Sequence, residues 1–120
     1  MKILVVDDFS TMRRIVRNLL VELGFSNGLI QEADDGESAL TLLRSTPFDM
    51  VVTDWNMPNM TGIELLENLT KAGHKVKFGF ITTEATPEMR SRAASAGARF
   101  LISKPFTADS FKEALEPHIK

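Results

Sequence analysis

Short apolar runs alternate with segments of helical periodicity five times along the chain, and this alternation restricts the fold more than any other feature. The runs predict strands at about 2–6, 29–33, 49–54, 76–82 and 98–103. The first, third and fifth runs are mostly continuously apolar, which is typical of strands covered on both faces of a parallel sheet. Right-handed crossovers between such strands predict a doubly wound α/β domain, with five parallel strands flanked by five helices.

The segments between these runs carry helix signals. We expect five helices. Three lie at about 10–23, 36–45 and 61–72, and the other two begin after Thr86 and Thr107. Thr61 and Glu64 form a capping-box pattern. Ser10 is the expected cap of the first helix, and Gly24 is its expected end. The apolar residues of this first helix recur at three- and four-residue steps and should face inward: Met12, Ile15, Val16, Leu19, Leu20 and Leu23.

The composition is that of an ordinary globular domain. The 120 residues suit one domain, predicted to span 1–120, and 43% of them are hydrophobic while 25% are charged. No apolar run approaches the roughly 20 residues that cross a bilayer, and the absence of cysteine fits the cytoplasm. The net charge of −2 gives no footprint for nucleic acid, so Arg13, Arg14 and Arg17 are interpreted as a solvated helix face. We expect a cytoplasmic monomer that binds neither membrane nor nucleic acid.

Polar side chains stand where four of the predicted strands end. Asp7 and Asp8 follow the first strand, Asp54 ends the third, Thr82 ends the fourth and Lys104 follows the fifth. The carboxyl ends of parallel strands meet at one edge of the sheet, where ligands bind in open α/β folds. We therefore expect these five side chains to form one site. Taken singly, each has a plainer structural interpretation, as an acid beside a helix N-terminus, a threonine cap or a lysine in a turn.

The predicted site suits phosphoryl transfer. Three carboxylates this close together repel one another and raise one another's pKa, and a divalent cation relieves the repulsion. Oxygen ligands without histidine or cysteine indicate Mg²⁺ rather than Zn²⁺. Lys104 supplies a cation for a phosphoryl oxygen, and Thr82 supplies a hydroxyl donor. The nucleophile would be an aspartate carboxylate, and its product would be an acyl phosphate.

Several motifs resemble the receiver domains of two-component response regulators, in particular the single-domain receivers of chemotaxis, and the match covers essentially the whole chain. These motifs are Val5-Val6-Asp7-Asp8-Phe9-Ser10-Thr11-Met12-Arg13-Arg14, Asp54-Trp55-Asn56-Met57-Pro58-Asn59-Met60 with Gly62, Glu32-Ala33-x-Asp35-Gly36 and Lys104-Pro105-Phe106-Thr107. The resemblance implies the strand order 2-1-3-4-5. It also implies a cis peptide bond between Lys104 and Pro105, which would turn Lys104 back towards Asp54.

The resemblance further implies a role for each residue of the site. Asp54 would be the phospho-acceptor, and Lys104 would be the lysine that contacts the phosphoryl group. Thr82 would be the switch hydroxyl because it has the family's spacing to Lys104, and Thr83 is its rival for that role.

By the same resemblance, Asp8, Asp54 and the backbone carbonyl of Asn56 would bind Mg²⁺, and Asp7 would act through a water. Trp55 adjoins this site, and two interpretations of it stay open. It is either half exposed over the site or a partial cover of the core.

A protein of this kind would receive its phosphoryl group from a histidine kinase. It would then change its affinity for a partner such as the flagellar motor switch protein, and a phosphatase is a further implied partner. It would be a signalling phospho-acceptor that assists its own phosphorylation and dephosphorylation, and not an enzyme with a separate substrate.

One departure from the family pattern bears on the output. Chemotaxis receivers have a switch tyrosine three residues before the lysine, and this position is Leu101 here. Phe100 is one residue away, so strand alternation should turn it to the other face of the sheet. A second hypothesis is therefore a receiver that accepts phosphate without driving a motor, as a phosphate sink or in another complex. Gly79, inside the predicted fourth strand, is unfavourable there, and the sequence offers no reason for it.

Two other classes of protein use a similar sheet. Small Mg²⁺-dependent phosphohydrolases of the haloacid dehalogenase type also form an aspartyl phosphate. They need an Asp-x-Asp motif after the first strand and a substrate cap, and the run Asp7-Asp8-Phe9 lacks that spacing. A flavodoxin-like flavin protein needs a phosphate loop rich in serine, threonine and glycine at the same place, where two acids would repel phosphate without a metal.

Overall fold

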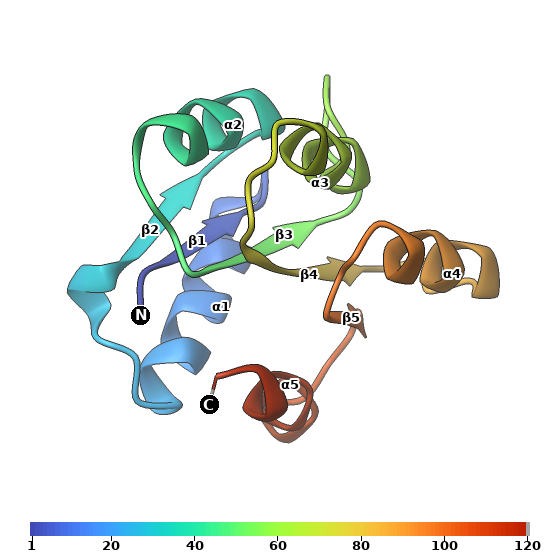
Figure 1. The fold of residues 1–120 in the computed structure, drawn as a ribbon. Coiled ribbons are helices and arrows are strands. Elements are labelled where there is room, and N and C mark those ends of the chain that lie inside the picture. Colours follow the sequence, from blue (N-terminus) through green and yellow to red (C-terminus); the bar gives the residue numbers. More distant parts are fainter. Residues whose placement is uncertain (120) are drawn as a thin grey trace.

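Five parallel strands form the centre of the computed structural model, which describes residues 1–119 (Figure 1). The strands are β1 (Ile3–Val6), β2 (Ile30–Ala33), β3 (Met50–Asp54), β4 (Lys77–Thr82) and β5 (Phe100–Ser103). Their order across the sheet is β2-β1-β3-β4-β5, so the predicted order is confirmed. Each neighbouring pair is parallel, and the carboxyl ends of the strands therefore lie at one edge.

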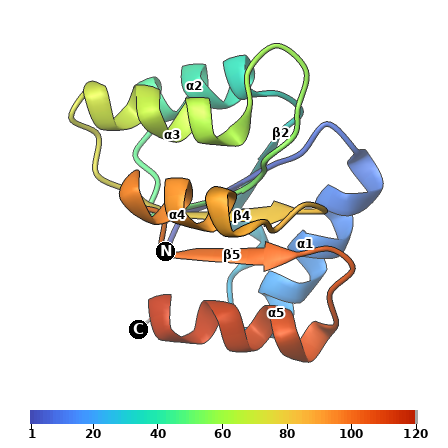
Figure 2. The same cartoon turned by 90° about the vertical axis from the view of Figure 1, so that its right-hand side faces the viewer.

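Helices cover both faces of the sheet. One face carries α1 (Ser10–Glu22) and α5 (Ala108–Leu115), and the other carries α2 (Gly36–Ser45), α3 (Gly62–Lys71) and α4 (Pro87–Ser95). Figure 2 shows α1 and α5 on one side of β4 and β5, with α2 and α3 on the opposite side. Short 3₁₀ turns lie at Asn27–Leu29 and Glu116–His118. Within residues 1–119, no helix has both the length and the apolar character needed to cross a membrane.

The strands divide their side chains between two hydrophobic clusters, one on each face. In β1, Leu4 and Val6 pack on the side of α2 and α3, whereas Ile3 and Val5 pack on the side of α1 and α5. Every residue of β1 and β3 is buried. The continuous apolar pattern of these strands therefore results from burial on both faces, and the predicted fold class is confirmed.

Three helices begin as the sequence predicts. The hydroxyl oxygens of Thr61, Thr86 and Thr107 accept hydrogen bonds at 3.3, 3.1 and 3.0 Å from backbone N–H groups three residues later. The predicted cap of α1 is wrong, because Phe9 occupies the N-cap position without a side-chain hydrogen bond and Ser10 is already helical. The backbone N–H of Phe9 instead donates to the side chain of Asp7, two residues earlier.

Other differences from the predicted elements are small. Ile15 was expected to face inward but is 42% exposed, because it lies at the margin of the stripe in which Val16 and Leu19 are buried. β2 begins at Ile30, since Leu29 belongs to the preceding 3₁₀ turn. β5 begins at Phe100, two residues later than expected. Gly24, at a φ of 104°, follows the last turn of α1 as predicted.

The structure explains Gly79 in β4. It lies opposite Phe100 of β5, and a Cβ atom at position 79 would overlap the Phe100 ring. That ring stacks on His118 with centroids 5.7 Å apart, and the carbonyl of His118 accepts a 2.6 Å hydrogen bond from Lys77 Nζ. His118 is consequently half-buried. Glycine is needed at position 79 because the Phe100 side chain occupies the space above it.

Candidate functional site

Three aspartates meet at the carboxyl edge of the sheet, as the sequence predicts. β1 pairs with β3, and Val6 lies opposite Thr53, so the residues that follow the two strands are neighbours. Asp7, Asp8 and Asp54 each offer a carboxylate oxygen, and these oxygens lie within 4.8 Å of one another. Adjacent parallel strands therefore bring together acids that are 46 or 47 positions apart in the sequence.

The three carboxylates differ in burial and in hydrogen bonding. Asp7 and Asp54 are only 3% and 8% exposed, whereas Asp8 is open to solvent. Oδ1 of Asp7 accepts a 2.9 Å hydrogen bond from the backbone N–H of Phe9. Two buried acids and one exposed acid form a cluster that a cation can reach from solvent through Asp8.

A close backbone approach lies directly beside this acidic cluster. The loop after β3 returns over the strand end, and the N–H of Gly62 donates a 2.8 Å hydrogen bond to the carbonyl of Trp55. A Cβ atom at position 62 would overlap the carbonyl oxygen of Asp54. Glycine at this position therefore allows α3 to begin directly against the end of the strand that carries Asp54.

Lys104 completes the cluster. Its Nζ lies 3.5 Å from Oδ2 of Asp7 and 3.5 Å from Oδ1 of Asp54. The backbone N–H of Lys104 donates to the carbonyl of Thr82 at 2.7 Å, and the Lys104–Pro105 peptide bond is cis, as predicted. Lys104, which follows the fifth strand, thus lies beside the acids at the ends of the first and third strands.

Burial makes the carboxylates difficult to ionise. It is the main cause that raises the pKa of Asp54 to about 6, with the Asp7 charge adding to the effect and Lys104 opposing it. Burial also raises the pKa of Asp7 above its usual range, against the hydrogen bond from Phe9 and the charge of Lys104. One lysine therefore does not compensate for the gathered negative charge, and a further cation would be stabilised here.

The donor set fits Mg²⁺. All three candidate side chains offer carboxylate oxygens, and the described residues contribute no histidine to the cluster. Hard cations such as Mg²⁺ prefer oxygen ligands and retain several waters, which suits a cluster in which one acid is exposed to solvent. Receiver domains typically bind this ion at an acidic pocket. Asn56 lies exposed two residues after Asp54, in the loop that follows β3.

Thr82, which ends β4, and Thr83, which follows it, differ in their surroundings. Thr82 is fully buried, and its hydroxyl oxygen accepts a 3.1 Å hydrogen bond from the N–H of Glu84. Thr83 is exposed. In the sheet, Asp54 pairs with Ile81, so Thr82 lies one residue beyond the partner of the candidate nucleophile.

Trp55 is buried, and the interpretation that it is half exposed is wrong. The residue is 6% exposed, and its ring packs on Phe80 with centroids 4.8 Å apart. The core on the side of α2 and α3 takes up the ring because residue 55 continues the alternation of β3. The tryptophan nevertheless adjoins Asp54 in the chain.

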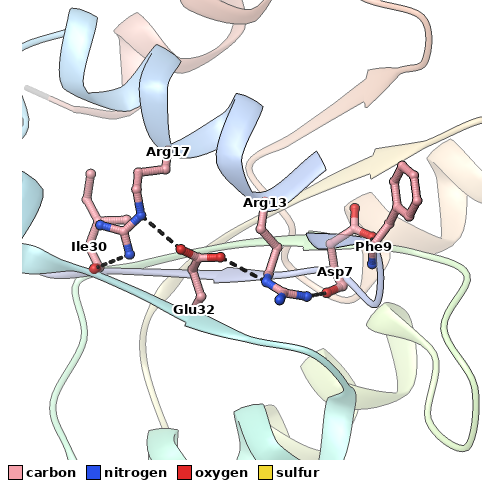
Figure 3. Close-up of polar contacts among 6 residues, drawn as sticks. All are labelled: Asp7, Phe9, Arg13, Arg17, Ile30 and Glu32. Atoms are coloured by element: carbon pink, nitrogen blue, oxygen red, sulfur yellow. Dashed lines mark hydrogen bonds and ion pairs between the residues drawn. The ribbon is translucent and has the colours of Figure 1, made fainter. Parts of the chain in front are cut away.

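Sequence reasoning missed an ion-pair network beside the site (Figure 3). Arg14 is exposed as predicted, but Arg13 and Arg17 turn towards Glu32 of the edge strand β2, with both Nε–Oε distances at 2.9 Å. Burial favours a higher pKa for Glu32, but hydrogen bonds from the two arginines outweigh it and hold that pKa below its usual range. The four-residue spacing of the arginines was the available signal, although their partner lies on another element.

Comparisons with known proteins agree with this geometry. Residues 3–116 match the family model described as the response regulator receiver domain. The chain is 56% identical to the chemotaxis protein CheY-3 of Vibrio cholerae, over 97% of this chain and 89% of the relative. It is 52% identical to the chemotaxis protein CheY of Pseudomonas aeruginosa, over 97% of this chain and 94% of the relative.

Solved structures give the same result. The chemotaxis response regulator CheY4 of Vibrio cholerae superposes with a TM-score of 0.85 at 30% identity, over 97% of this chain and 96% of that one. The chain therefore belongs to the response regulator receiver domains of two-component systems, and within them to the CheY type of chemotaxis.

Proposed function

We propose that this protein is a signalling module in which Asp54 accepts a phosphoryl group from a histidine kinase. The observation that carries the proposal is the position of Lys104, whose Nζ lies 3.5 Å from Asp54 and 3.5 Å from Asp7. An ammonium group between two buried acids is placed to contact a phosphoryl oxygen on either of them. Asp54 ends a fully buried strand, so its carboxylate is held on a rigid element.

The proposed transfer follows from the groups present. A carboxylate oxygen of Asp54 bonds to phosphorus while the phosphorus–nitrogen bond of the kinase phosphohistidine breaks, and the imidazole leaves with a proton from solvent. The product is an acyl phosphate. Lys104 stabilises the charge on the equatorial oxygens, and the hydroxyl of Thr82 is the proposed second donor.

The metal proposed for the site is Mg²⁺, held by the carboxylates of Asp8 and Asp54 and the backbone carbonyl of Asn56, with Asp7 acting through a water. When bound, the ion neutralises charge on the acids and on the transferring phosphoryl group. Asp54, whose ionised form burial disfavours, would be easier to ionise beside such a cation.

The proposed output is binding of a partner at the surface formed by α4, β5 and α5. The relatives named as chemotaxis proteins favour the flagellar motor switch as that partner. We further propose a cytoplasmic, monomeric protein that consists of one receiver domain over 1–120, is no enzyme in the ordinary sense, and has a phosphatase as a third partner.

A second candidate function keeps the phosphorylation chemistry but omits the motor. It is favoured by Leu101, which stands where chemotaxis receivers carry a tyrosine and is half-buried against the cluster on the α4 side. In that case the protein acts as a phosphate sink or serves another complex.

Labelling with a phosphodonor tests the proposed acceptor. We expect acetyl phosphate with Mg²⁺ to phosphorylate Asp54 alone, and Asp54→Asn to remove the label. Asp34→Asn is a matched control, because Asp34 directly follows β2 at the same edge and is exposed outside the cluster. Mass spectrometry of the borohydride-reduced adduct locates the phosphoryl group. Undiminished labelling of Asp54→Asn, or label on Asp7 or Asp8 in the wild type, contradicts the assignment.

A further inference from the structure

Arg13 reaches from helix α1 to the backbone of the acidic loop. Its Nη1 donates a 2.6 Å hydrogen bond to the main-chain carbonyl of Asp7, and its side chain is only 17% exposed (Figure 3). The carbonyl of Asp7 belongs to the peptide unit that joins Asp7 to Asp8. Fixing this oxygen restrains the plane of that peptide, which also contains the nitrogen and the Cα atom of Asp8, and so limits the directions that the Asp8 side chain can take.

Arg13 is itself held in place. Its Nε donates to Oε1 of Glu32 at 2.9 Å, and Arg17 donates to Oε2 of the same carboxylate at 2.9 Å. Arg17 continues to the carbonyl of Ile30 at 2.8 Å and to the side-chain oxygen of Asn27 at 2.8 Å. Glu32 is thus fixed by two arginines, and the planar guanidinium of Arg13 spans the distance from the edge strand to the acidic loop.

Asp8 depends on such support more than the other acids do. Oδ1 and Oδ2 of Asp7 have Phe9 and Lys104 as partners, and Asp54 also contacts Lys104. Among residues 1–119 the carboxylate of Asp8 has no hydrogen-bond or ion-pair partner, although it lies in the repulsive field of two other acids. At the start of α1, the N-cap residue Phe9 contributes no side-chain hydrogen bond, and its backbone N–H donates to Asp7 rather than to Asp8.

We propose that Arg13, anchored by Glu32, is a positioning residue that orients Asp8 for the divalent cation. This inference depends on the proposed function, since it assigns Arg13 to the Mg²⁺ site of the phospho-acceptor. Arg13 does not contact the ion itself. It holds the peptide from which a ligand projects, as outer partners of metal ligands do in other sites.

The charge of Arg13 and its contact with the loop predict opposite changes in Mg²⁺ affinity when Arg13 is replaced. Arg13 is a cation near a cation site, so its charge alone disfavours Mg²⁺, and its removal would tighten binding. If instead Arg13 orients Asp8, its removal weakens Mg²⁺ binding, because the Asp8 side chain must then be ordered when the ion binds, which costs binding free energy. The sign of the change in affinity therefore separates the two effects, and a merely structural role would leave the affinity unchanged in folded protein.

Paired substitutions test this inference. Arg13→Met and Arg17→Met each remove one cation and one bond to Glu32 while keeping an apolar stem, but only Arg13 contacts the loop carbonyl. Mg²⁺ is titrated into each protein without a phosphodonor, and binding is followed by Trp55 emission and by the rise in melting temperature. We expect Arg13→Met to weaken Mg²⁺ binding about tenfold and Arg17→Met less than about threefold.

A third variant keeps the inference testable if Arg13→Met does not fold. Arg13→Lys retains the charge, but one ammonium group cannot reproduce the fork that joins Glu32 to the Asp7 carbonyl, so we expect weakening here as well. Unchanged or tighter binding in the folded Arg13 variants, or equal loss in Arg17→Met, overturns the inference. If the wild type shows no response to Mg²⁺ by either measurement, the proposed metal site itself is contradicted.

Discussion

Asp54 combines two properties that oppose each other in an isolated side chain. It is 8% exposed, and burial raises its pKa to about 6, yet its proposed chemistry requires the ionised carboxylate. The neighbouring Lys104 opposes the shift, and the proposed cation would add to this compensation. The acidic cluster therefore destabilises the metal-free protein, as is common where charged groups are gathered for function.

The stability of the metal-free protein should therefore depend on Asp54 and pH. The folded pKa of about 6 lies above the ordinary value of 3.8, so the folded protein binds an extra proton between these values, and stability falls as pH rises from about 3.8 to about 6. We expect Asp54→Asn to be more stable than the wild type at pH 7.5 in EDTA by about 1–3 kcal/mol, and to lose that advantage near pH 4. Urea unfolding across this range measures it.

Asp34→Asn is the control for this measurement, because Asp34 is an exposed acid outside the cluster. It should follow the pH profile of the wild type. A constant difference between Asp54→Asn and the wild type at all pH values would show that Asp54 titrates as it does in the unfolded chain.

The strands β4 and β5 pack together at one glycine of β4 and one aromatic ring of β5. Phe100 packs above Gly79 on the side of α1 and α5, whereas Leu101 packs on the opposite side with α4. The ring of Phe100 also stacks on His118 and so joins the C-terminal turn to the sheet. The aromatic residue of this strand therefore has a structural role on the face away from α4.

We expect Gly79→Ala to destabilise the protein by about 1–3 kcal/mol, because a Cβ atom there forces the Phe100 ring to move. Gly28→Ala is the control, since a Cβ at that position meets no atom within 4 Å, and it should change stability by less than about 0.5 kcal/mol. The free energy of unfolding in urea gives both values. Phe100→Leu should cost less in the Gly79→Ala background than in the wild type, and additive costs would contradict direct contact.

The site and the proposed output surface lie on different parts of the molecule. The acids stand at the carboxyl edge of the sheet, while α4, β5 and α5 are side by side at its β5 end (Figure 2). Phosphorylation can change the output surface only if an element that links it to the site has two arrangements. Phosphorylation must stabilise one of these arrangements more than the other. Leu101 lacks the ring and hydroxyl of the switch residue in related chemotaxis receivers, and it stands beside a hollow of about 190 Å³ that Ala94 and Ala98 also line.

We expect phosphorylation to change the affinity for a flagellar switch peptide by less than about tenfold, which corresponds to about 1.4 kcal/mol. If Leu101 stays packed, the surface differs little between the phosphorylated and unphosphorylated protein, and so does its affinity for a partner. Calorimetry with and without beryllofluoride measures both affinities. Leu101→Tyr, whose ring the hollow could accept, should increase the ratio, and a large ratio already in the wild type would show that the switch does not need the aromatic.

The sequence by itself determined the fold class and the members of the acidic cluster. Continuous apolar runs identify strands buried on both faces, and Asp7, Asp8, Asp54 and Lys104 directly follow or end such runs, so their common edge follows from parallel pairing. Helix starts at Thr61, Thr86 and Thr107 were predictable because capping is a contact between residues three positions apart.

Tertiary structure alone decided the contacts between elements that are distant in the chain. Arg13 has the pattern of a solvated residue until Glu32 of β2 is placed beside it, and Gly79 is unexplained until Phe100 lies across it. Trp55 was equally compatible with exposure until Phe80 was packed against its ring. Periodicity states which face of an element turns inward, but the partner of a side chain depends on the register and packing of other elements, which no local pattern contains.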